Sequence, residues 1–133
     1  MNSLNLEILT PERKVLDVQV SRVNLQGSLG RLGILPNHTP LIAQLDFGIL
    51  EYTQGHKNEE VLCGDGLVEV NDNKVTVVVR SAETAAKIDV ERAKRAYERA
   101  KSRLHSKDEG FDLNRAESAF KRANERLKFT KFN

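Results

Sequence analysis

The stretch Leu67–Arg80, LVEVNDNKVTVVVR, decides the fold of the N-terminal part of the chain. Valine recurs at alternating positions on both sides of a short polar segment, residues 71–73. The alternating residues are Val68, Val70, Val75, Val77 and Val79. A period of two residues is typical of β-strands that bury one face, and asparagine and aspartate favour tight turns. The stretch therefore predicts a β-hairpin that turns at Asn71-Asp72-Asn73.

The same two-residue period extends toward the N-terminus. Its apolar positions are Leu4, Leu6, Ile8, Val18, Val20, Val23 and Leu25. Clusters of glycine, proline and asparagine separate the short apolar runs, as in Gly27–Pro40, GSLGRLGILPNHTP. Many short strands with turns between them are typical of sandwiches and barrels. We therefore expect residues 1–84 to form an antiparallel β-sandwich or flattened barrel.

After Lys87 the apolar period changes from two residues to 3.6. Alanines recur on one helical face in Ile88–Ala100, IDVERAKRAYERA, and Asp89 is a suitable N-cap. A segment with Gly110 interrupts this pattern, and Asp112 is placed to cap a second helix. The expected seam residues are Ala93, Ala96, Tyr97, Ala100 and Leu104, then Leu113, Ala116, Ala119, Phe120, Ala123 and Leu127. Residues 85–133 are thus predicted to form an antiparallel two-helix hairpin, and the fold class is α+β.

The predicted hairpin combines weak apolar packing with excess positive charge. An alanine seam buries little area, at about 25 cal/mol for each Å², and isolated helices of about 15 residues are marginal in water. Residues 1–88 contain eight Lys and Arg against eleven Asp and Glu, whereas residues 89–133 contain thirteen against eight. This asymmetry indicates an anionic ligand or surface for the hairpin. Marginal stability suits an element that changes conformation.

Six arginines on the predicted helices lack an acidic residue four positions away, and two of them are Arg103 and Arg115. Arg92 and Arg99 share one face of the first helix, and Arg122 and Arg126 share one face of the second. One interpretation is a solvated basic face on an exposed helical pair. The other is a clamp for phosphate groups. A charge-assisted hydrogen bond contributes about 1.5–3 kcal/mol, and millimolar binding needs only about 4 kcal/mol, so two or three contacts suffice.

Several classes of function are disfavoured by the sequence. There is no G-x-x-x-x-G-K-[ST] phosphate loop, and His38, His56 and His105 lack metal-ligand spacing. The single cysteine, Cys63, has no basic neighbour and is expected to be buried. No stretch is apolar enough to cross a bilayer, and the N-terminal MNSLNLEIL resembles no targeting peptide. These features predict a cytosolic, non-catalytic protein without a bound metal.

Three stretches together resemble a known family. They are Gly30–Leu50 (GRLGILPNHTPLIAQLDFGIL), Gly66–Val78 (GLVEVNDNKVTVV) and Ile88–Ala93 (IDVERA). Their order and separations resemble the epsilon subunit of bacterial F-type ATP synthases, whose mitochondrial counterpart is called delta. The resemblance covers essentially the whole chain, and it agrees with the sandwich-plus-hairpin fold.

The resemblance implies a non-catalytic subunit of the central rotor stalk, peripheral to the cytoplasmic face of the bacterial cell membrane. The sandwich would contact the gamma subunit and the c-ring, and would help to couple rotation to ion translocation. The hairpin would either lie folded or extend along gamma toward the alpha/beta catalytic ring and inhibit ATP hydrolysis. No cofactor is required, but ATP would be a regulatory ligand that stabilises the folded hairpin.

The resemblance also implies particular contact residues. The family's ATP motif, Ile/Leu-Asp-x-x-Arg-Ala, is matched at residues 88–93. The implied nucleotide contacts are Glu83, Ile88, Asp89, Arg92, Ala93, Arg99, Arg122 and Arg126. The implied contacts with the c-ring or gamma are Arg31, on a turn that faces the ring, and the turn residue His38.

Two alternatives remain open on the sequence. The chain could be a purely structural stalk subunit without affinity for nucleotide, which a binding measurement would reveal. A basic helical hairpin could instead bind nucleic acid. Tyr97, Phe111 and Phe120 lie on the seams or in the loop, however, and leave few surfaces for base stacking. We therefore expect no nucleic acid partner.

Overall fold

The computed structural model describes residues 3–84, 90–104 and 113–131. The chain divides into two compact units, residues 1–84 and residues 85–133, which we call the body and the hairpin. The predicted caps Asp89 and Asp112, and the predicted break at Gly110, lie outside the described residues.

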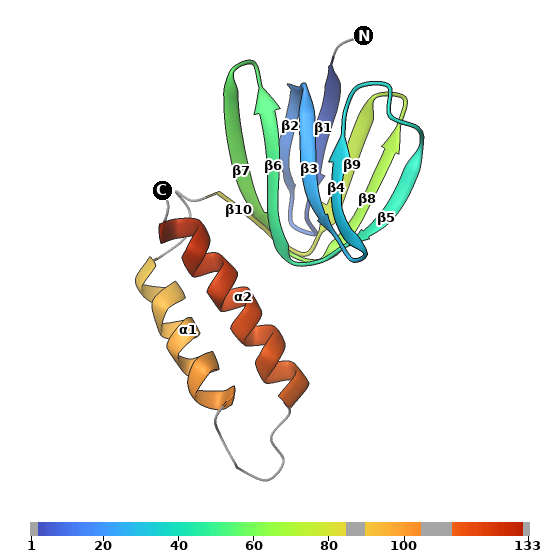
Figure 1. Ribbon diagram of the computed structural model, residues 1–133. Coiled ribbons are helices and arrows are strands. Elements are labelled where there is room, and N and C mark those ends of the chain that lie inside the picture. Colours follow the sequence, from blue (N-terminus) through green and yellow to red (C-terminus); the bar gives the residue numbers. More distant parts are fainter. Residues whose placement is uncertain (1–2, 85–89, 105–112, 132–133) are drawn as a thin grey trace. The chain divides into compact units, whose positions relative to one another are not determined.

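The body contains ten strands among the described residues. They are β1 (Leu4–Leu9), β2 (Lys14–Val20), β3 (Arg22–Gly27), β4 (Gly30–Ile34), β5 (Leu41–Leu45), β6 (Gly48–Gln54), β7 (Lys57–Cys63), β8 (Gly66–Asn71), β9 (Lys74–Val79) and β10 (Ala82–Glu83). Hydrogen bonds join them in the order β10-β7-β6-β3-β5-β8-β9-β1-β2, and β4 pairs with β3. The sheet curls around one core until β2 lies against β6 (Figure 1). The predicted sandwich or flattened barrel is confirmed.

One pair of strands departs from the predicted antiparallel arrangement. β1 runs parallel to β9, with Leu6 beside Val75 and Ile8 beside Val77. β1 also pairs with β2 in the antiparallel sense, so it lies inside the sheet and not at an edge. Alternation along a strand shows which face is buried, but it is the same for both strand directions. The sequence pattern therefore could not predict this pairing.

The core is filled by the alternating side chains that the sequence pattern selected. The alternating valines of β8 and β9, at positions 68, 70, 75, 77 and 79, are at most 2% exposed, and Leu4, Leu6 and Ile8 are fully buried. Full burial of one such side chain stabilises the fold by about 1.5–3 kcal/mol relative to exposure. The body is therefore held by many large apolar side chains.

The turn between β8 and β9 contains two residues, Asp72 and Asn73, whose φ angles are 49° and 60°. Asn71 pairs with Lys74 at the end of the strands, so the predicted three-residue turn was one residue too long. Positive φ at both central residues matches the tight turns that suit the twist of a β-hairpin. The Asn73 Oδ1 atom accepts a hydrogen bond from the backbone N–H of Asn37 at 2.6 Å, and Asn73 Nδ2 donates to Asn37 Oδ1 at 3.2 Å.

The hairpin consists of α1 (Val90–Leu104) and α2 (Leu113–Lys131), which pack side by side in antiparallel directions (Figure 1). Their contact is the predicted alanine seam. Its most buried members are Ala93, Ala100, Ala116 and Ala123, which are 3–5% exposed. The rings of Tyr97 and Phe120 lie 5.2 Å apart between centroids, tilted by 36°. Phe129 is also buried, although the seam did not include it.

Candidate functional site

A cavity of about 230 Å³ lies between the two helices of the hairpin. Its lining contains only alanine and arginine among the described residues. The lining residues are Ala96, Arg99, Ala100 and Arg103 of α1, and Ala119, Arg122, Ala123 and Arg126 of α2. On each helix these positions follow the spacing i, i+3, i+4 and i+7, which is one helical face. The cavity therefore forms where two matching faces meet.

An internal repeat produces this match. Residues 93–104 read AKRAYERAKSRL, and residues 116–127 read AESAFKRANERL. Both follow the pattern A-x-x-A-aromatic-x-R-A-x-x-R-L, at an offset of 23 residues. The aromatic residues of the two copies, Tyr97 and Phe120, are in contact with each other. The two helices thus present the same face to each other around an approximate two-fold axis.

The cavity lining brings four positively charged arginines close together, with only alanines between them. Arg99 and Arg103 are four residues apart on α1, as are Arg122 and Arg126 on α2, and like charges at this spacing destabilise a helix by about 0.2–0.5 kcal/mol per pair. No carboxylate is part of the cavity lining in the described chain. An anion in the cavity would offset this repulsion and accept hydrogen bonds from the guanidinium groups.

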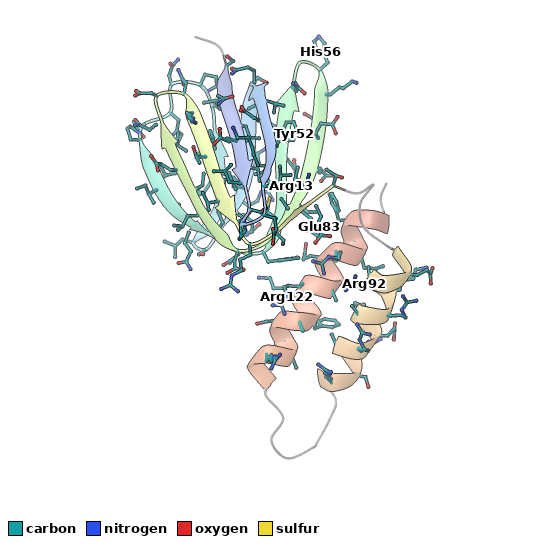
Figure 2. All side chains as sticks on the ribbon, turned by 180° about the vertical axis from the view of Figure 1, so that it is seen from behind. Arg13, Tyr52, His56, Glu83, Arg92 and Arg122 are labelled. Atoms are coloured by element: carbon teal, nitrogen blue, oxygen red, sulfur yellow. The ribbon has the colours of Figure 1, made fainter. Side chains whose placement is uncertain are left out.

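The structure brings together three of the predicted nucleotide contacts. Arg99, Arg122 and Arg126 line the cavity, while Arg92 is exposed on α1 about 10 Å before Arg99 along the helix axis. Figure 2 shows Arg92 on α1 and Arg122 on α2. Ala93 is 3% exposed within the seam and packs the helices together.

The other predicted contacts do not belong to this cavity. Glu83 is half-buried on β10 of the body, where it pairs with Leu62 of β7. Ile88 and Asp89 lie outside the described residues. The roles implied for these three residues stay predictions.

Arg103 lines the cavity but was not among the predicted contacts. The absence of an acidic residue four positions away does not distinguish Arg103 from Arg115, which shares that property and is not in the lining. The internal repeat could have separated them, because Arg103 occupies the same place in the first copy as Arg126 in the second.

The two residues predicted to contact the c-ring or gamma have local partners in the body. The prediction that Arg31 lies on a turn is wrong, because Arg31 lies in β4 and pairs with Gln26 of β3. Its guanidinium is 3.6 Å from a carboxylate oxygen of Glu51 on β6, and both side chains are about half exposed. The Nδ1 atom of His38 lies 2.6 Å from the carbonyl oxygen of Thr39, and its backbone N–H donates to the carbonyl of Leu35 at 3.2 Å. His38 is thus held within the turn between β4 and β5.

Cys63 is 4% exposed, which confirms the expected burial. Removal of the side chain from water disfavours the thiolate and raises the thiol pKa to about 12. The described residues contain no cluster of histidine, cysteine, aspartate and glutamate that could hold a metal ion.

Apolar side chains gather on the outer face of three neighbouring strands of the body. Ile42 of β5 is 73% exposed, and Leu67 of β8 and its cross-strand partner Val78 of β9 are about half exposed. Leu29, at the turn between β3 and β4, is fully exposed. Contiguous exposed apolar surface of this kind marks protein contact sites.

Comparisons with known proteins agree with these features of both units. The model of the ATP synthase delta/epsilon chain β-sandwich domain matches residues 3–85, and the model of the long alpha-helix domain of the same chain matches residues 86–131. The chain belongs to the ATP synthase delta/epsilon family. The resemblance to a bacterial epsilon subunit that the sequence motifs indicated is therefore confirmed.

Relatives in this family align over most of their length. The chain is 50% identical to the ATP synthase epsilon chain of Lawsonia intracellularis over 107 residues, which is 80% of each chain. It is 48% identical to the epsilon chain of Carboxydothermus hydrogenoformans over 103 residues, 77% of each.

Two solved structures share the fold. A chain in the Euglena gracilis mitochondrial ATP synthase (OSCP/F1/c-ring) superposes with a TM-score of 0.83 and 25% identity, covering 96% of this chain and 81% of that one. A chain in the central stalk and c-ring of the Tetrahymena thermophila mitochondrial enzyme gives a TM-score of 0.63, with 17% identity and 96% of each chain covered. No helix in the described part of this epsilon-family chain is both long and apolar enough to span a bilayer.

Proposed function

We propose that this epsilon-family chain is a non-catalytic subunit of the central rotor stalk whose hairpin inhibits ATP hydrolysis and is held folded by bound ATP. The observation that carries the proposal is the cavity that collects Arg99 from α1 with Arg122 and Arg126 from α2. A ligand that needs arginines from both helices binds only when the helices lie together. Such a ligand shifts the population toward the folded hairpin.

The energetics of the hairpin suit such a switch. Its seam is built mainly from alanines, which bury little apolar area, and its arginines repel one another across and along the helices. A triphosphate supplies the charge that offsets this repulsion. When ATP is scarce, the balance favours separation of the helices, which then extend along gamma toward the alpha/beta catalytic ring.

The remaining predicted contacts complete the nucleotide site in this proposal. The triphosphate occupies the cavity, and Arg92 lies toward the nucleoside end of the ligand. The family's ATP motif supports this direction, since Ile88, Asp89 and Arg92 all precede the cavity residues in the sequence. Glu83 stays among the nucleotide contacts that the family resemblance implies.

The body fixes the subunit to the stalk in the same proposal and helps to couple rotation to ion translocation. Its exposed apolar residues Ile42, Leu67 and Val78 provide a surface for gamma. Leu29 at the turn between β3 and β4, together with Arg31 near the start of β4, provides one for the c-ring. The subunit would then be peripheral to the cytoplasmic face of the bacterial cell membrane.

Calorimetric titration of the purified chain with ATP tests the nucleotide site. Arg122→Gln should weaken ATP binding about tenfold or more, because one charge-assisted contact of about 1.5–3 kcal/mol is lost. Lys121→Gln removes the same charge from the neighbouring position, which does not line the cavity, and should leave the affinity unchanged. If the parent chain binds no ATP, the chain is a structural stalk subunit only.

Removal of residues 85–133 in the assembled synthase tests the inhibitory role. The truncated complex should retain the body and hydrolyse ATP faster than the complete complex at low ATP concentration. Equal hydrolysis rates in the two complexes, with the body still bound, would reject inhibition by the hairpin.

A further inference from the structure

We propose that the hairpin cavity binds linear condensed inorganic phosphate, and that it needs no nucleoside for binding. This inference rests on the proposed function, since it concerns the same cavity. It names the ligand class that the cavity lining selects. Sodium tripolyphosphate is the simplest member of that class.

The lining offers hydrogen-bond donors and no side-chain acceptor. Each guanidinium carries five N–H donors, and alanine carries no polar side-chain atom. The adenine amino group can only donate, so it finds no side-chain acceptor in this cavity, and ribose hydroxyls can take part there only as acceptors. A phosphate chain carries acceptor oxygens throughout, so the lining complements the chain and does not recognise the base.

The four arginines form a line along the hairpin. The contact between Tyr97 and Phe120 brings these two positions of the antiparallel helices level. Counted from that level, the order along the axis is Arg126, Arg122, Arg99 and Arg103. Measured along the hairpin axis, each arginine is offset from the next by the length of four helical residues, which is about 6 Å. A linear polyanion matches this row of charges better than a compact anion.

The approximate symmetry of the cavity supports the same ligand. The internal repeat makes the two ends of the row equivalent, with Arg103 at one end and Arg126 at the other. A linear inorganic phosphate chain reads the same from both ends, whereas ATP has a nucleoside at one end only. The cavity lining alone therefore gives ATP no preferred direction, and residues outside it must provide that direction.

Affinity should therefore rise with the number of phosphates. Orthophosphate can reach one or two guanidinium groups, while tripolyphosphate and longer chains reach more of the row. Binding should fall steeply with added salt, because the attraction is between exposed charges.

The test is calorimetric titration of the complete chain with sodium tripolyphosphate in low-salt buffer without magnesium. We expect one tripolyphosphate per chain and weaker binding of orthophosphate. Arg99→Gln and Arg103→Gln should each weaken tripolyphosphate binding about tenfold or more. Arg95→Gln removes an exposed arginine from the same helix, outside the cavity, and should leave the affinity unchanged. Circular dichroism checks that each variant keeps its helices.

Three outcomes would overturn the proposal. The first is heat of dilution alone at millimolar tripolyphosphate. The second is equal weakening by Arg95→Gln and Arg99→Gln, which would indicate unspecific attraction to a basic helix. The third is failure of tripolyphosphate to displace ATP where ATP binds, since both ligands would need the same arginines.

A parallel titration with ATP separates this inference from the proposed function. If ATP binds and tripolyphosphate does not, the ATP-regulated function stands and the inference fails. If tripolyphosphate binds and ATP does not, the inference stands and the ATP-regulated function fails. If neither binds, both fail.

Discussion

The body and the hairpin bury their apolar residues in opposite ways. The body encloses fully buried leucine, isoleucine and valine side chains within a curled sheet, whereas the seam in the described part of the hairpin consists mainly of four buried alanines and one pair of rings. The first arrangement stabilises one structure strongly. The second buries little apolar area, so the free energy of association of the two helices should be similar in size to a few charge interactions. In the proposed function, this small free energy lets a bound ligand determine whether the helices associate. In the proposed function, the chain thus joins a rigid unit to one that changes conformation.

The largest difference between the units should appear when one leucine in each is shortened. Leu6→Ala, in the fully buried core of the body, should lower the free energy of unfolding by about 2–5 kcal/mol. Leu127→Ala, at a half-buried seam position, should cost less than about 1.5 kcal/mol and affect only the hairpin. Urea unfolding followed by circular dichroism measures both changes. A similar loss of unfolding free energy in the two variants would contradict the proposed difference in packing between the body and the hairpin.

The turn at Asn73 tests how far the rigidity of the body depends on polar contacts. Asn73→Ala should lower the stability of the body by about 1–3 kcal/mol, because it removes two hydrogen bonds to Asn37 and leaves a residue that disfavours positive φ. Asn73→Gly loses the same hydrogen bonds but tolerates the backbone conformation. It should therefore cost about 1 kcal/mol less than the alanine variant. Thermal unfolding of the two variants separates the two effects.

Loss of the ring contact in the hairpin should lower the free energy of unfolding by less than Leu6→Ala or Asn73→Ala does in the body. Tyr97→Ala removes the contact with Phe120, which contributes about 0.5–1.5 kcal/mol beyond the area it buries. Amide hydrogen exchange should become faster in α1 and α2 and stay unchanged in the strands of the body. Arg95→Ala provides the control on the same helix. Faster exchange throughout the body would show that the two units do not respond independently.

The smallest expected effect concerns Cys63. Because burial raises its thiol pKa to about 12, the thiolate is scarce at pH 8, and a thiol reagent should not label the folded body. The unfolded thiol ionises near its ordinary pKa of 9.0, so the contribution of this group to stability is complete below pH 9 and is lost as the pH rises toward 12. Labelling kinetics from pH 7 to 10 measure this directly. Rapid labelling at pH 8 would contradict the burial.

The comparison also explains which features the sequence could predict. The alternating valines of β8 and β9 and the alanines of the seam were identified because burial leaves a local period of two or 3.6 residues. The parallel pairing of β1 with β9 leaves no such period. Arg103 was not selected, because its place in the cavity depends on how two helices align, and no single helix contains that information. Local pattern thus predicted the elements. The pairing of β1 with β9 had to come from the structure, whereas the internal repeat also indicates how the two helices align.

The parallel pairing of β1 and β9 also limits when the body can fold during synthesis on the ribosome. β1 is among the first residues to be synthesised, yet the strand beside it, residues 74–79, emerges only after most of the body has been made. Until then β1 has β2 as its only neighbour, and one edge of the nascent ribbon stays open. Nascent chains interrupted before Lys74 should therefore attract chaperones or proteases, while the two helices, whose contacts are closer along the chain, can form without waiting for a distant partner.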